Sequence, residues 1–248
     1  VAQAQDWPGG APVELRVWVP WVLRAKGERE AALNALENLL ASETRYYAGW
    51  RLIADWYEQE KNYAKVLQAS RKLLELAEHD PQAHVYVADA AAALDDKDTA
   101  KRHYERALAR RPRYLYAAYR WFDLLLDEEA CEEAARILER VAPHIEVAGR
   151  PYFTVRELGL AAARGHGDEV FKLLDQVVRA PQDDAWLFEK AFGVIAQSGW
   201  KDRMCAWLGS ILSSAESINP LAVTAWATVR AKDKTWRLRR REMTAVIA

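Results

Sequence analysis

The sequence predicts an all-α protein, a solenoid of antiparallel helix pairs, on three observations. Small or apolar residues recur at the same places every 34 residues, with a single spacing of 36. Glycine or a polar residue stands in the middle of each period, where the chain must reverse between two helices. Prolines stand where one helix ends or the next begins, and these are the places that tolerate them. Each helix pair of such an array buries its inner faces by stacking on its neighbours.

The clearest period runs from Pro81 to Pro112. Its first helix carries small or apolar residues at positions 7, 8 and 11 of the unit, and its second helix carries them at positions 20, 24, 27 and 28. These residues are Val87, Ala88 and Ala91, followed by Ala100, Tyr104, Ala107 and Leu108. The pattern resembles the tetratricopeptide repeat (TPR), whose unit of about 34 residues is a helix–turn–helix. The resemblance implies a right-handed α-solenoid of TPR-like antiparallel helix pairs.

At the beginning of the chain, residues 1–12 contain a Pro-Gly-Gly cluster and no helical period, so we expect an irregular lead-in. The TPR-like solenoid is expected over residues 13–248. Its seven units begin at Val13, Tyr47, Pro81, Leu115, Pro151, Ala185 and Asn219. In the first unit, Pro20 predicts that the first helix starts near Val19 or kinks there. The two extra residues of the long period lie within residues 143–150, where we expect a bend.

The turn inside each unit falls at position 15. The residues at this position are Gly27, Lys61, Asp95, Glu129, Gly165, Gly199 and Asp233. Glycine allows backbone angles that other residues avoid, and polar residues suit an exposed turn. The two helices of every unit are therefore expected to reverse there.

The composition limits the classes of partner. With 35 Lys and Arg against 36 Asp and Glu, the formal net charge is -1, which gives no whole-chain attraction to nucleic acid or to an anionic membrane. The two cysteines, Cys131 and Cys205, fall on helical patterns, so neither a disulfide framework nor a zinc site is predicted. No apolar run approaches the roughly 18 residues of a membrane-spanning helix, so no membrane insertion is expected. We therefore expect a cytoplasmic protein, and the first residue, Val1 rather than Met, is compatible with a piece of a longer chain.

The sequence predicts no catalytic site. It contains no Gly-rich phosphate loop, no H-E-x-x-H motif and no G-x-S-x-G motif. The five histidines fall at unrelated positions of the repeat, and no two of them share a helix face with the spacing of metal ligands. We therefore expect no enzyme activity, no metal and no cofactor.

The richer signal lies on the first helices of the units. At about 100° per residue, positions 2, 5, 6, 9 and 13 point away from the stacking core. The resemblance implies that this face lines a concave groove, which binds a peptide or protein partner. The predicted groove residues are Arg51, Asp55, Tyr86, Asp89, Tyr116, Tyr119, Arg120, Asp123, Tyr152, Arg156 and Trp186, and the same face includes Gln82 and Val85. Tyr, Trp and Arg often anchor interfaces, because they combine a large contact area with a polar group.

Two interpretations of this face stay open. Asp55, Asp89 and Asp123 share position 9, so they are expected to form a ladder whose carboxylates accept hydrogen bonds from an extended peptide. Alternatively, the tyrosines pack between units, and Arg51 merely pairs with Asp55 four residues along one helix. Truncating an anchor of a partner would cost little folding stability, whereas truncating a packing residue would cost more.

A basic segment near the C-terminal end is the other charged feature. It contains Lys232, Lys234, Arg237, Arg239, Arg240 and Arg241 around Trp236. Such a segment is compatible with the phosphates of RNA or lipid, but the near-zero net charge argues against nucleic acid, so we interpret it as a solvated or partner-docking helix. Trp226, Val229 and Leu238 belong to the last unit, which no following repeat covers. We therefore expect either a further cap or self-association through this end.

The sequence thus predicts a non-enzymatic protein-binding scaffold with a groove for a peptide or protein partner. Helical hairpins also stack in proteins of other functions, so two alternatives remain. One is a TPR-like segment or subunit of a larger enzyme, such as a glycosyltransferase or a prenyltransferase-type assembly. The other is an RNA-processing scaffold.

Overall fold

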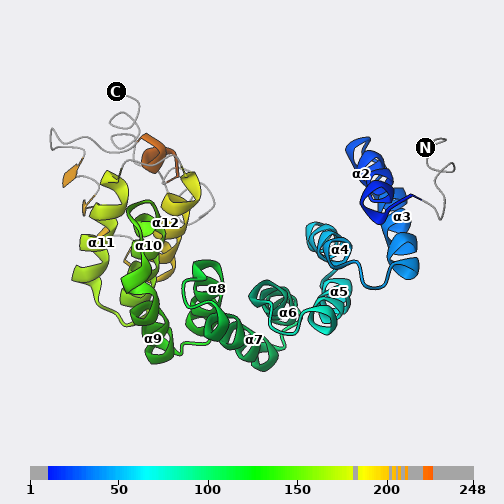
Figure 1. The fold of residues 1–248 in the computed structure, drawn as a ribbon. Helices are drawn as coiled ribbons and strands as arrows, with labels where there is room; N and C mark the ends of the chain where they lie inside the picture. Colours follow the sequence, from blue (N-terminus) through cyan, green and yellow to red (C-terminus); the bar gives the residue numbers. More distant parts are fainter. Residues whose placement is uncertain are drawn as a thin grey trace. The chain divides into compact units, whose positions relative to one another are not determined.

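The computed structural model describes residues 11–180, 184–200, 203–204, 206–207, 210–211 and 220–225. Every regular element in these ranges is a helix, and successive helices are joined by short turns (Figure 1). The predicted all-α fold of TPR-like helix pairs is confirmed. None of the described helices is long and apolar enough to span a membrane.

The chain divides into two compact units, unit 1 over Val1–Trp121 and unit 2 over Phe122–Ala248. The helices of unit 1 are α1 (Val13–Arg16), α2 (Trp18–Ala25), α3 (Arg29–Ser42), α4 (Tyr47–Gln59), α5 (Tyr63–Leu76), α6 (Pro81–Ala93) and α7 (Lys97–Arg110), and α8 (Leu115–Asp127) runs across the boundary. Unit 2 continues with α9 (Cys131–Val141), the short 3-10 helices η2 (Ala142–His144) and η3 (Val147–Gly149), α10 (Arg150–Ala163), α11 (Gly167–Arg179) and α12 (Ala185–Gln197).

Each helix packs mainly on its neighbours in the chain. In unit 1, α2 packs on α3, α4 on α5 and α6 on α7, and α5 also packs on α6. In unit 2, α10 packs on α11 and on α12, so these three helices lie side by side (Figure 1). Nearest-neighbour packing of hairpins is the architecture expected of a repeat solenoid. The division into seven units and the bend at residues 143–150, where η2 and η3 lie, stay predictions.

The turns inside the hairpins lie where the sequence predicts them. All six position-15 residues of the described chain have a positive φ. They are Gly27, Gly165 and Gly199, with φ of 83°, 74° and 77°, and Lys61, Asp95 and Glu129, with φ of 56°, 63° and 60°. A left-handed residue reverses the chain directly after a helix, and glycine adopts this conformation without steric cost. The predicted reversal at position 15 is confirmed at these six places.

The helix starts follow from local chemistry. Asp80, Asp96 and Asp184 cap α6, α7 and α12 by accepting a backbone N–H of the first turn. In the first unit, Pro20 lies in the first turn of α2, where its missing N–H removes no helical hydrogen bond. The chain therefore forms the separate helix α1 and starts again at Trp18, which confirms the expected start near Val19.

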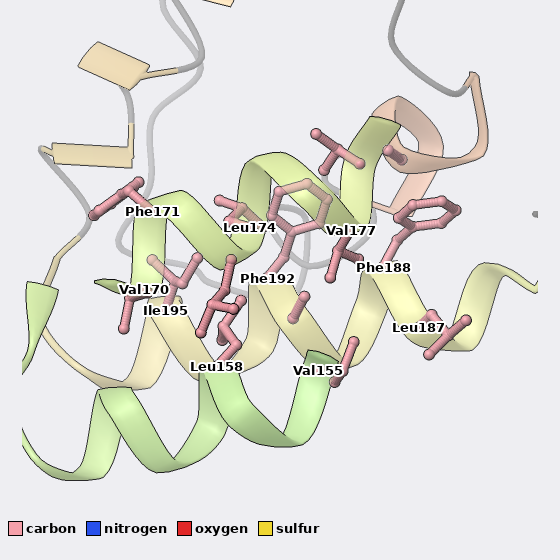
Figure 2. Close-up of a cluster of buried hydrophobic side chains, with 14 of the residues drawn as sticks. Val155, Leu158, Val170, Phe171, Leu174, Val177, Leu187, Phe188, Phe192 and Ile195 are labelled. Carbon is pink, nitrogen blue, oxygen red and sulfur yellow. The ribbon is translucent and has the colours of Figure 1, made fainter. Parts of the chain in front are cut away.

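Each unit has its own hydrophobic core. In unit 1, a buried cluster joins α3, α4 and α5 around Leu36, Ile53 and Trp56. In unit 2, α10, α11 and α12 enclose a second cluster, in which Leu158, Leu174, Phe188 and Phe192 are almost fully buried (Figure 2). These cores hold α4, α10 and α12, first helices whose remaining faces carry predicted groove residues.

Candidate functional site

The aspartates that were expected to form a ladder have hydrogen-bond partners inside the chain. Each aspartate at position 9 accepts a hydrogen bond from the side chain at position 6 of the next first helix. The pairs are Asp55 with Tyr86 Oη, Asp89 with Arg120 Nε at 2.9 Å, and Asp123 with Arg156 Nη2 at 3.2 Å. The same register recurs because both positions repeat with the unit. These contacts tie one first helix to the next, as the packing interpretation expects.

In unit 1, the contacts converge on one carboxylate, and we define Asp89, Tyr104, Tyr116 and Arg120 as the Asp89 cluster. Tyr104 Oη and Arg120 Nε both donate to Oδ1 of Asp89, and Tyr116 Oη donates to Oδ2 at 3.0 Å. Asp89 and Tyr104 are buried, whereas Tyr116 is 49% exposed and the Arg120 side chain is 45% exposed. A buried carboxylate therefore holds two exposed side chains in defined positions.

The electrostatics of this cluster keep its tyrosines as donors. Burial, and then the neighbouring Asp89 charge, raise the pKa of both Tyr104 and Tyr116 well above the ordinary value. Burial raises the pKa of the nearby Glu58 carboxyl, and the charges of Asp89 and Asp55 raise it further, while Arg120 opposes them. The surface around Arg120 is therefore rich in acidic groups, and the positive charge of the guanidinium partly balances them.

In unit 2, the equivalent pair lies beneath aromatic rings, and we define Asp123, Tyr152, Arg156 and Trp186 as the Trp186 cluster. The Arg156 side chain is only 8% exposed, and its Nη1 donates to the Tyr152 carbonyl at 3.0 Å. The guanidinium carbon lies 5.9 Å from the centre of the Trp186 ring. Trp186 also stacks on Tyr152, with ring centres 6.2 Å apart and an angle of 25° between the planes. Trp186 remains 43% exposed, so the aromatic residue rather than the arginine faces solvent here.

One aspartate holds both aromatic residues of this cluster. Asp184 accepts a hydrogen bond from Tyr152 Oη at 2.6 Å through Oδ2 and one from the Trp186 backbone N–H at 3.0 Å through Oδ1. Next to it lies a cavity of about 840 Å³ between η3, the start of α10 and the end of α11. Its lining includes Val147, Arg150, Tyr152, Thr154, Gln176 and Asp184. Hydrogen bonds thus position the Trp186 cluster, and its Tyr152 lines this cavity.

The remaining predicted groove residues differ in their exposure to solvent. Arg51 is exposed and Tyr119 is half-buried. The expectation for Val85 is wrong, because this side chain is only 4% exposed. The helix that carries it, α6, packs against both α5 and α7 and is buried on most of its surface. The predicted basic segment with Lys232, and the last-unit surface around Trp226, lie outside the described residues.

Sequence reasoning missed one pair of titratable groups, His84 of α6 and His103 of α7. Their Nδ1 atoms lie 3.1 Å apart across the hairpin. Burial lowers the pKa of His84, and burial together with the charge on His84 lowers the pKa of His103 to about 4. The search for metal ligands compared only residues on one helix, whereas these two face each other from the two helices of one unit. Within the described residues, no group of three or more possible metal ligands occurs.

Comparisons with known proteins agree on the fold. No model of a protein family matches the sequence, and no curated protein matches it. Among solved structures, a TPR protein from Parabacteroides merdae is 14% identical and has a TM-score of 0.68, over 95% of this chain and 97% of that chain. PilW, a widely conserved type IV pilus biogenesis factor, is 12% identical with a TM-score of 0.61, over 88% of this chain and 97% of that chain. YrrB, a TPR protein with an unusual peptide-binding site, is 14% identical with a TM-score of 0.52, over 79% of this chain and 90% of that chain.

Proposed function

Since the chain has the tetratricopeptide-repeat fold, we propose that it is a non-enzymatic scaffold that binds a peptide or protein segment through its first helices. Two similar structures support a role of this kind, because one is a protein with a peptide-binding site and the other is a factor in pilus biogenesis. A shared fold does not define a partner, so the argument depends on the exposed side chains of this chain.

The observation that carries the proposal is the fixed position of the exposed anchors. Tyr116 and Arg120 are exposed, yet the buried Asp89 accepts a hydrogen bond from each. Trp186 is exposed, yet Tyr152 and Arg156 lie against its ring. Tyr, Trp and Arg are the residue types enriched among binding hot spots, and a side chain already held in place loses less entropy when a partner binds.

The aspartates have a different role in this proposal from the one expected from the sequence. Asp55, Asp89 and Asp123 accept hydrogen bonds within the chain, so they position the anchors instead of contacting peptide amides. In unit 1, the half-exposed guanidinium of Arg120 and the hydroxyl of Tyr116 suit polar groups of the partner. The surrounding carboxylates disfavour an acidic side chain there. In unit 2, the exposed Trp186 ring, stacked on Tyr152, suits an apolar or cationic side chain.

Truncation of the anchors tests the proposal. The tagged chain captures its partner from the source cell, and the affinity of that partner is then measured for Tyr116→Ala, Arg120→Ala and Trp186→Ala. Each change is expected to weaken binding by about 1–3 kcal/mol. Arg164→Ala is the matched control, because Arg164 pairs at 2.7 Å with Glu132, whose side chain is 79% exposed, outside both clusters. Unchanged affinity in all three stably folded variants would place the binding surface elsewhere.

The enzyme-subunit alternative, the RNA-processing alternative and the cytoplasmic localisation stay predictions. The contacts of the described residues favour none of them over the scaffold.

A further inference from the structure

Helices α1 and α2, at the beginning of the chain, carry an exposed apolar surface. Leu15, Trp18, Val19, Trp21 and Val22 are each between 43% and 63% exposed. An exposed cluster of large apolar side chains marks an interaction surface in most proteins. This face therefore suits a contact with another surface, and it lies apart from the Asp89 and Trp186 clusters in the sequence.

Four of these residues form a stripe with helical spacing, which we call the α2 stripe: Leu15, Trp18, Val19 and Val22. Residues separated by three or four positions lie on one face of a helix. Val17, between α1 and α2, keeps right-handed helical angles, so the stripe continues across the break that Pro20 causes. Trp21 flanks the stripe and packs edge-on against the buried Trp56, with ring centres 5.7 Å apart. That contact anchors the helix and leaves the stripe outward.

We propose that the α2 stripe is a dimerisation surface, on which the same stripe of a second copy of this chain packs in antiparallel orientation. The spacing of the stripe reads the same in both directions along the helix. The intervals between Leu15, Trp18, Val19 and Val22 are three, one and three residues. A two-fold axis between Trp18 and Val19 therefore pairs Trp18 with the partner's Val19 and Leu15 with the partner's Val22. Each contact joins a larger side chain to a smaller one, which favours interdigitation of the helices.

Charge supports the antiparallel orientation. Glu14 is exposed at one end of the stripe and Lys26 at the other, while the neighbouring Arg16 and Arg24 pair within the chain with Glu43 and Glu60. Antiparallel pairing brings Glu14 of one copy toward Lys26 of the other, whereas parallel pairing would bring like charges together. Complementary charges at the rim of an interface set its orientation.

The size of the surface suits a weak dimer. Five large apolar side chains, each about half exposed, amount to a patch of the size of the largest on an ordinary monomer, roughly 300–600 Å². Two such patches, with their polar rims, approach the roughly 1,200 Å² at the lower limit of a stable interface.

The test is the oligomeric state of the full chain by sedimentation velocity, over about two decades of concentration. The mass of the wild-type particle is expected to rise from that of the 28.2 kDa chain toward twice that value. A wild-type chain that stays monomeric throughout overturns the proposal, whether residues 1–10 or another protein cover the stripe.

Two variants at Val19 test the geometry, because this residue lies beside the proposed axis, where it pairs with Trp18 of the second copy and comes close to Val19 of that copy. Val19→Glu and Val19→Lys should each weaken self-association by on the order of a hundredfold, since like charges would meet at the centre of the interface. An equimolar mixture of the two variants should restore the dimer. Failure of the mixture to associate overturns the antiparallel pairing of α2.

The matched control is Leu94→Lys. Leu94 is 47% exposed directly after α6, so this variant introduces a charge at an apolar residue of similar exposure away from α2. It should associate like the wild type, and all three variants should keep the wild-type helicity by circular dichroism. A control that loses association together with the Val19 variants also overturns the proposal, because the effect would then follow from charge alone.

Discussion

The Asp89–Arg120 pair of unit 1 and the Asp123–Arg156 pair of unit 2 occupy the same repeat positions but have opposite exposures. In unit 1 the arginine side chain is 45% exposed and the aspartate 11%, whereas in unit 2 the arginine is 8% exposed and the aspartate 22%. The neighbours cause the difference. In unit 1, two tyrosine hydroxyls donate hydrogen bonds to the aspartate. In unit 2, the Trp186 ring lies over the guanidinium of the arginine. The same Asp–Arg pair thus forms at both places of the repeat, and the adjacent aromatic residues determine whether the arginine or the aspartate is more exposed.

This difference predicts different roles for the two arginines. A charge-assisted hydrogen bond with one exposed partner contributes modestly to stability, because water can replace the lost partner. A buried arginine whose removal leaves a partly buried carboxylate alone contributes much more in a mutational test. Arg120 is therefore available for a partner, and Arg156 is a structural support for the exposed Trp186.

The largest expected effect is the loss of stability in Arg156→Ala. The change removes the donor to Asp123 and the support beneath Trp186, and should lower the free energy of unfolding by about 3 kcal/mol. Arg120→Ala leaves Asp89 with its two tyrosine donors and should cost only about 1 kcal/mol. Urea unfolding of both variants checks the prediction. Equal losses would show that exposure does not separate the two pairs.

Lowering the pH is expected to have a smaller effect on the stability of the fold, and this effect should also differ between the two units. The described part of unit 2 has no histidine pair comparable to His84 and His103. Since the pKa of His103 is about 4 in the folded chain and near 6.5 in the unfolded chain, the unfolded state binds more protons between these values. The stability is therefore complete above pH 6.5 and falls as the pH decreases toward 4, by on the order of 1 kcal/mol once partial exposure is allowed for.

Arg102 and Arg106 also face His103, and Arg106 and Arg110 face His84, so a proton there meets mainly positive charge. Asp80 alone opposes this near His84 through its charge. Hydrogen exchange at pH 7 and pH 5 should therefore show faster opening of α6 and α7, with α10 and α11 little changed. His103→Gln should abolish most of the difference. A uniform acceleration over both units would contradict the assignment to this pair.

The sequence predicted the features that depend on chain geometry. The reversal at Lys61, Asp95 and Glu129 followed from the repeat period, because a hairpin needs a turn at a fixed place whichever residue occupies it. The recurring pairing of Asp55, Asp89 and Asp123 with position 6 of the next first helix also follows the period.

The partners of these aspartates could not be predicted. Position 6 points toward the groove edge on a helical wheel, but a long side chain there reaches the preceding first helix, as Arg120 and Arg156 do. Whether the arginine is then exposed depends on Trp186, one whole unit further along the chain. Val85 was misplaced for a related reason, since a wheel describes one helix and not the neighbours that bury it.

The smallest expected effect is that of Tyr116→Phe, which is best measured beside Tyr104→Phe because both tyrosines donate to Asp89. Tyr104→Phe removes a donor from the buried side of the carboxylate, and should cost about 1–2 kcal/mol because no water replaces it. Tyr116→Phe removes the donor on the exposed side, where water can take its place, and should cost no more than about 0.5 kcal/mol. Thermal unfolding of the single variants and the double variant measures both terms and their coupling. If Tyr116→Phe were the more destabilising of the two, Tyr116 would be a packing residue of unit 1, and its place among the anchors for a partner would have to be abandoned.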